Sequence, residues 1–246
     1  MDPSSTELPV SPTPAEDAIH SSSADALIAA AGDAGLSEDM ALALLKRRDL
    51  PAEALEHLAR NAAVMKSRKV KLALVEHPRT PRHISLPTIR HLFTFDLMQV
   101  ALTPVVPPDV KAAADETLIN RLETIPSGQR LALARRASGR VAEALLADGE
   151  ARVMEAALEN ARLTEAGVVK ALMRAAATAG LVQAVCHHAK WSLRREVRIA
   201  LLRNQHTPMA RAVEFARGLP APMVREILHG SHLAPSIKEF LVKSLG

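Results

Sequence analysis

The chain has 246 residues, 48% of them hydrophobic and 2% aromatic, and a formal net charge of +4. Charge is uneven along the chain, since residues 1–62 hold 4 Lys/Arg and 11 Asp/Glu whereas residues 63–246 hold 27 and 16. The single cysteine excludes an intramolecular disulfide, and no apolar run reaches the roughly 18 residues that a membrane helix needs. We therefore expect a soluble cytoplasmic protein without a membrane segment, and the first residues do not have the pattern of a signal peptide.

Residues 1–23 are rich in Pro and Ser and poor in large apolar residues. Such a segment buries too little surface to offset the entropy of ordering, so we predict a disordered tail. Residues 24–62 show helical spacing of Leu and Ala, with Ser37 placed to cap one helix and Pro51 placed to open another. We interpret residues 24–62 as N-terminal cap helices of a single α-helical domain over residues 24–246, in which residues 63–246 are repeats.

A short phrase recurs through residues 63–246. It reads ALVEHPRTP from Ala73, ALENARLTE from Ala157, ALLRNQHTP from Ala200 and ILHGSHLAP from Ile227, and two looser copies lie between the first and the second. Successive copies begin 28, 31, 25, 43 and 27 residues apart. Self-similarity at such intervals is typical of stacked helical repeats, and the 43-residue interval predicts an additional helix pair.

The phrase predicts a junction between two helices. Its Ala–Leu pair ends an apolar helix face, and Thr80, Thr164 and Thr207 are predicted N-caps of the helix that follows. Pro81 and Pro208 fit the first helical position, where a missing N–H does no harm. Because the sequence has no sustained period-two alternation, the expected fold class is all-α. We expect an α-solenoid, a superhelix of stacked antiparallel helix pairs.

The stretch from Ala157 to Pro220 resembles bacterial helical-repeat proteins of the leucine-rich-repeat-variant and HEAT-like kind. In those proteins phrases such as A-L-x-N-P-x-T-P recur, often with a Trp shortly before V-R-x-A-L. Asn160 and Asn204 match the Asn of that pattern, whereas other residues replace the Pro that follows it. The resemblance covers roughly residues 64–246 and implies an interaction scaffold. Some members of such families carry an iron–sulfur cluster on a Cys-rich segment, which one cysteine cannot supply.

Basic residues gather near several copies of the phrase, and we predict that they form a binding ridge. The ridge residues are Lys66, Lys69, Arg135, Arg136, Arg140, Arg194, Arg195 and Arg198. Leu193, Val197, Ala200 and Leu201 are predicted to form the core stripe of the helix that carries the last three arginines. Since the basic sets recur at similar points of the repeat, stacking would align them for a phosphate backbone or an acidic peptide. The alternative is a set of solvated helix faces.

Three other groups of residues have a functional and a structural interpretation. Trp191 is either an anchor for a partner or a plug packed between repeats, and packing is the commoner role. Cys186, His187 and His188 suggest a metal site, but consecutive helix residues point in different directions, so we expect none. Glu143 and Asp148 are paired carboxylates that solvation of a helix surface explains equally well.

The sequence features favour three possible functions to different degrees. The repeats favour a non-enzymatic scaffold that binds a protein partner, an acidic one being an option, through its concave and basic surface. The alternative is a nucleic-acid-binding HEAT-like protein that uses the basic ridge, although the scarcity of aromatic residues argues against base stacking. An enzyme is least supported, since no catalytic residues and no cofactor are indicated. The acidic N-terminal segment is also a candidate autoinhibitory strap on the basic body. The sequence predicts no oligomeric state.

Overall fold

The computed structural model describes residues 23–244, and every regular element within them is helical. This confirms the prediction of an all-α fold. The chain divides between Thr117 and Leu118 into two compact units. The single domain expected over residues 24–246 stays a prediction. The predicted tail, apart from Ser23, lies outside the described residues.

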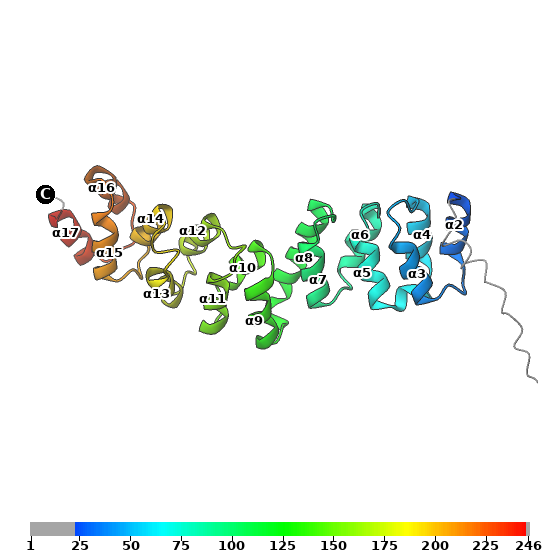
Figure 1. The fold of residues 1–246 in the computed structure, drawn as a ribbon. Coiled ribbons are helices and arrows are strands. Elements are labelled where there is room, and N and C mark those ends of the chain that lie inside the picture. Colours follow the sequence, from blue (N-terminus) through cyan, green and yellow to red (C-terminus); the bar gives the residue numbers. More distant parts are fainter. Residues whose placement is uncertain (1–22, 245–246) are drawn as a thin grey trace, which may run out of the picture. The chain divides into compact units, whose positions relative to one another are not determined.

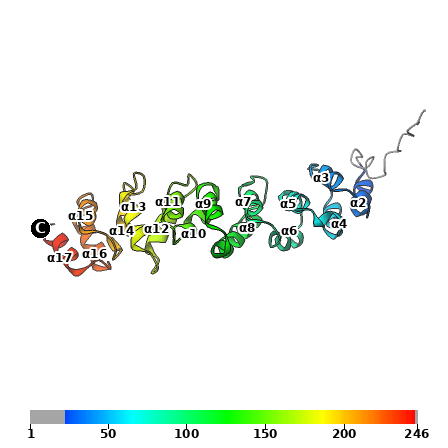
Figure 2. The same ribbon diagram turned by 90° about the horizontal axis from the view of Figure 1, so that it is seen from below.

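In the first unit, helices contact their second neighbours along the chain. Its helices are α2 (Ala24–Gly32), α3 (Glu38–Leu45), α4 (Ala52–Arg60), η1 (Val64–Lys66), α5 (Arg68–Glu76), α6 (Arg82–Ile89) and α7 (Thr94–Leu102). Helix α8 (Pro108–Arg121) contains the boundary between the units. Helix α2 contacts α4, α3 contacts α5, and α5 contacts α7. The pair α2 and α4 lies side by side in both views (Figures 1 and 2).

The second unit has the same order of contacts. Its helices are η2 (Leu122–Thr124), α9 (Ser127–Arg136), α10 (Gly139–Leu145), α11 (Ala151–Leu158), α12 (Glu165–Met173), α13 (Ala179–His187), α14 (Arg195–Arg203), α15 (Met209–Arg217), α16 (Ala221–His229) and α17 (Pro235–Ser244). One series of contacts joins α9, α11 and α13, and another joins α10, α12, α14 and α16. The 43-residue interval contains α12 and α13 as complete helices, as predicted, but each other interval between phrases contains one complete α-helix, so the interval adds one helix rather than a pair.

The apolar stripes of the helices form the core. In α14, Val197, Ala200 and Leu201 are buried, as their helical spacing predicts. The prediction is wrong for Leu193, which is 69% exposed, because the helix begins only at Arg195 and Leu193 lies in the turn before it. The small residues Ala and Val at these positions allow neighbouring helices to approach closely.

The turn between the helices differs in one respect from the prediction. Pro81 and Pro208, not the threonines before them, occupy the N-cap positions of α6 and α15. Thr80 and Thr207 are buried, and each hydroxyl donates a hydrogen bond of 2.6 Å to a carbonyl in the last turn of the preceding helix. Each threonine therefore supplies a hydrogen-bond donor to a carbonyl at the end of one helix, rather than an acceptor to the N–H groups at the beginning of the next helix. Thr164 is an N-cap as predicted, and it accepts from the N–H of Gly167.

A side-chain amide joins each of three turns to an earlier part of its own unit. Asn61, Asn160 and Asn204 each accept a hydrogen bond through Oδ1 from the N–H two residues ahead. Their Nδ2 atoms donate to carbonyls 28, 26 and 32 residues earlier, at distances of 2.8, 2.7 and 2.9 Å. His77 makes the same pair of bonds with its ring nitrogens, the earlier carbonyl being that of Arg47 at 2.8 Å. This recurring bond gives the asparagine of the sequence phrase a structural role.

Candidate binding surface

The predicted ridge residues of the first unit are exposed. Lys66 ends η1, and Lys69 lies in the first turn of α5 with its Nζ 3.4 Å from Glu38 Oε1. Arg68, between them, donates two hydrogen bonds to the buried carboxylate of Asp96 and lies 5.0 Å over the Phe93 ring. Arg68 is therefore committed to contacts within its own unit, which leaves the two lysines as the accessible cations of this set.

The next three predicted residues lie on two different faces of the second unit. Arg135 and Arg136 are exposed at the end of α9, and Arg140 is exposed in the first turn of α10. Arg135 borders a hollow over α9, α11 and α13, whereas Arg140 borders a groove beside α10 and α12. The structure does not bring these arginines together on one surface.

The last three predicted arginines have different environments. Arg194 is the exposed N-cap residue of α14, and Arg195 is exposed in its first turn with Nη2 3.4 Å from Met223 Sδ. Arg198 is half-buried, since its Nε donates to the Ser192 carbonyl at 2.7 Å and its guanidinium lies 5.6 Å over Phe215. Only the first two therefore offer a free cationic surface.

Trp191 lies in the interior of the second unit. It is 1% exposed, and its indole N–H donates a hydrogen bond of 2.8 Å to the carbonyl of Leu158 at the end of α11. This position fits the packing interpretation and corrects the anchor interpretation, because a buried ring offers no surface to a partner. The indole N–H, which is the polar group of the ring, therefore has its hydrogen-bond partner within the fold.

The Cys–His cluster has internal partners. Cys186 is fully buried, and burial raises the pKa of its thiol to about 11. His187 Nδ1 bonds to the Gln183 carbonyl, whereas His188 Nδ1 accepts from backbone N–H groups of the following turn. His188 Nε2 is 3.2 Å from Glu159 Oε1 but is not aligned for a hydrogen bond. Among residues 23–244, no three His, Cys, Asp or Glu side chains are grouped so as to hold a metal ion.

A groove of about 700 Å³ lies beside α10 in the second unit, and we call it the α10–α12 groove. Its apolar lining comes from Ile119, Leu122, Ala144, Leu145 and Ala147. Its charged lining consists of the cations Arg130, Arg140, Lys170 and Arg174 and the carboxylates Glu123, Glu143 and Asp148. The groove therefore combines an apolar surface with charges of both signs.

Glu143 organises one side of this groove. Its Oε1 is 2.9 Å from Lys170 Nζ and 2.9 Å from Arg174 Nη2, so one carboxylate holds a cation of α12 and the cation that follows α12 as its C-cap residue. The Glu143 side chain is 16% exposed, whereas those of Lys170 and Arg174 are 67% and 42% exposed. Both cations are therefore accessible beside a largely buried carboxylate.

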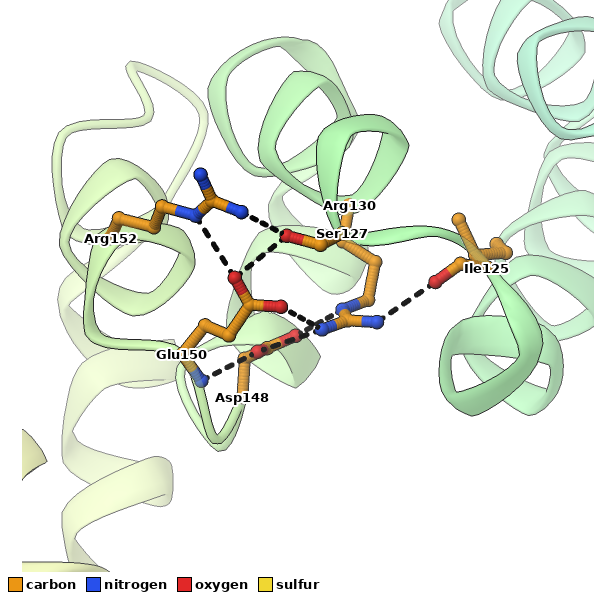
Figure 3. Close-up of polar contacts among 6 residues, drawn as sticks. All are labelled: Ile125, Ser127, Arg130, Asp148, Glu150 and Arg152. Atoms are coloured by element: carbon orange, nitrogen blue, oxygen red, sulfur yellow. Dashed lines mark hydrogen bonds and ion pairs between the residues drawn. The ribbon is translucent and has the colours of Figure 1, made fainter.

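A hydrogen-bond network fixes two further lining residues of the groove, Arg130 and Asp148 (Figure 3). Arg130 Nε donates to Asp148 at 2.7 Å, its Nη2 donates to Glu150 at 2.8 Å, and its Nη1 donates to the Ile125 carbonyl at 2.8 Å. The second oxygen of Glu150 accepts from Ser127 and from Arg152. These hydrogen bonds, first that of Ser127 and then that of Arg152, lower the pKa of Glu150. Arg130 is therefore held in place, and its positive charge is neutralised by two carboxylates of its own unit.

Sequence reasoning found Arg140 but missed most of this groove. For Glu143 and Asp148 it left open a carboxylate pair or a solvated helix surface, whereas both side chains are largely buried in ion pairs with cations. Lys170 was not singled out, although it lies four residues before Arg174 in a helix with few other charges. That i, i+4 spacing was the available signal for a shared basic face.

Comparisons with protein-family models, with curated proteins and with solved structures give no match for this chain. The likeness to leucine-rich-repeat-variant proteins therefore stays a prediction from the sequence. Within residues 23–244, no helix has the length and apolar character required to cross a membrane.

Proposed function

We propose that the protein is an α-solenoid that binds a protein partner in the cytoplasm and acts by binding rather than by catalysis. The observation that carries this proposal is the recurring amide bond of the turns at Asn61, Asn160 and Asn204. Each turn contacts a carbonyl 26 to 32 residues earlier, which is close to the 25–31 residues that separate most copies of the sequence phrase. Contacts between second-neighbour helices within each unit support the same interpretation.

A repeat of this kind favours a binding role because stacked units expose successive helix faces as an extended surface. Charge favours an acidic partner for the second unit. Residues 118–246 hold 19 Lys/Arg and 11 Asp/Glu, a net charge of +8, whereas residues 1–117 hold 12 and 16, a net charge of −4. Opposite charge on the partner would accelerate association and exclude basic competitors.

Nucleic acid is the second candidate, and the exposed arginines of the second unit favour it. Arg135, Arg136 and Arg140 have no ion pair among the described residues and are available for phosphates. Against it, Trp191 is buried and cannot stack on a base. The acidic strap suggested by the sequence lies outside the described residues.

Affinity capture from a lysate, with and without nuclease, tests the two candidates. The full chain is immobilised, and bound proteins are identified by mass spectrometry. A discrete set of proteins that survives nuclease supports the scaffold, and its loss with nuclease favours nucleic acid. If the chain captures no more than an unrelated basic protein of similar size, the proposal of a binding scaffold is wrong.

A further inference from the structure

We propose that the α10–α12 groove binds an acidic peptide segment of the partner that places carboxylates beside apolar side chains. This inference rests on the proposed function and assigns it a site. Its basis is the arrangement of Arg140, Lys170 and Arg174 around Glu143 over an apolar surface.

The three cations are drawn together by the fold. Arg140 and Glu143 lie three residues apart on α10 and share a face. Glu143 in turn bonds to Lys170 of α12 and to Arg174, the residue that follows α12, at 2.9 Å each. Since one largely buried carboxylate pairs with two exposed cations and Arg140 lines the same groove, these residues have an excess of positive charge. Arg140 has no ion pair or hydrogen bond among the side chains of the described residues that line the groove, so it is free to bind an anion.

The site is also held in shape before any ligand binds. Glu143 restrains two flexible side chains, and the network of Arg130 with Asp148 and Glu150 fixes further lining residues of the groove. A restrained cation loses less side-chain entropy when it meets a carboxylate, which favours binding. Arg130 contributes shape rather than free charge, because two carboxylates already neutralise it.

The lining favours a peptide over a nucleic acid. Glu123 is exposed at the groove, so an evenly charged phosphate backbone would meet a carboxylate as well as cations. Leu122, Ala144 and Ala147 offer apolar contacts that a sugar–phosphate chain does not use. A peptide that alternates acidic and apolar side chains matches both features.

The test measures binding of a fluorescein-labelled peptide of repeated Glu-Glu-Leu units to the full chain by fluorescence anisotropy. A peptide of repeated Gln-Gln-Leu units is the uncharged reference, and an oligothymidylate is the nucleic-acid competitor. The variants are Arg140→Glu, Lys170→Gln with Arg174→Gln, and Glu143→Gln. Arg225→Glu is the matched control, because Arg225 is exposed on α16, outside the groove, and the substitution changes the net charge equally. Circular dichroism confirms that each variant is folded.

We expect the acidic peptide to bind more tightly than the uncharged one. Arg140→Glu should weaken it about tenfold, equivalent to about 1.4 kcal/mol, and Arg225→Glu by less than about threefold. Glu143→Gln should tighten binding, because the amide removes the negative charge beside Lys170 and Arg174 while its oxygen can still accept their hydrogen bonds and restrain them. This gain is a result that damage to the fold would not produce.

Three results would overturn the inference. The first is that the acidic peptide does not bind. The second is that Arg140→Glu and Arg225→Glu weaken its binding equally. The third is that the oligothymidylate binds more tightly and displaces the peptide. The lysate capture separates this failure from that of the proposed function. If Arg140→Glu keeps every captured protein, the groove is wrong and the scaffold stands, whereas a wild-type chain that captures nothing contradicts the scaffold itself.

Discussion

Replacing Asn160 with alanine tests whether the recurring amide bond stabilises the second unit. The Asn160 side chain is 2% exposed and makes three hydrogen bonds. Its Nδ2 donates to the carbonyls of Ala134 and Ala137 at 2.7 and 3.2 Å, and its Oδ1 accepts from the N–H of Arg162 at 2.8 Å. Alanine leaves two acceptors and one donor without a partner in a buried place, where each costs about 1–3 kcal/mol.

We therefore expect Asn160→Ala to lower the free energy of unfolding by about 3 kcal/mol. Asn204→Ala is the matched control within the same unit. Asn204 is half-buried and makes two such bonds, one to the Leu172 carbonyl and one from the His206 N–H, so water can replace part of the loss. For this control we expect a loss of about 1 kcal/mol.

Urea unfolding followed by fluorescence measures both values. Trp191 is the only tryptophan of the chain and is buried in the second unit, so its emission reports the unfolding of that unit. Far-UV circular dichroism on the same samples shows whether loss of helix accompanies loss of Trp191 burial. A loss from Asn160→Ala no larger than that from Asn204→Ala would refute the argument that burial makes this bond important.

Three further predictions concern single positions. A Cβ at Gly139 would collide with the carbonyl of Arg162, so Gly139→Ala should lower the free energy of unfolding by about 1–3 kcal/mol. Gly149→Ala, whose Cβ has no neighbour within 4 Å, should lower it by less than about 0.5 kcal/mol, and equal urea midpoints of the two variants would contradict this. Burial lowers the pKa of His77 from its ordinary 6.5, so the folded state binds this proton less readily than the unfolded state, and stability should fall as pH falls below about 6.5. His77→Asn, which places at this turn the residue found at the other turns, should therefore reduce the fall in melting temperature between neutral and mildly acidic pH. If the variant shows the same fall as the wild type, the argument from the buried neutral ring is wrong. Since burial raises the pKa of the Cys186 thiol to about 11, iodoacetamide should label it at mildly alkaline pH only after denaturation, as read by mass spectrometry; rapid labelling of the folded chain would show that the thiol is accessible.

The sequence by itself determined where helices form and that they repeat. Apolar residues three and four apart, caps such as Ser37 and Thr164, and the prolines at the turns act within a few residues, so they can be read from one short segment. For the same reason Val197, Ala200 and Leu201 were recognised as core, and Arg140 as an accessible cation.

Only the tertiary structure decided which distant groups meet. Thr80 and Thr207 turn inward to a helix end, and Asn160 reaches a carbonyl 26 residues away. Glu143 meets Lys170 and Arg174 only because α10 contacts α12. Helical periodicity fixes the direction of a side chain relative to its own helix, whereas its partner depends on how that helix packs on another, and no local pattern encodes that packing.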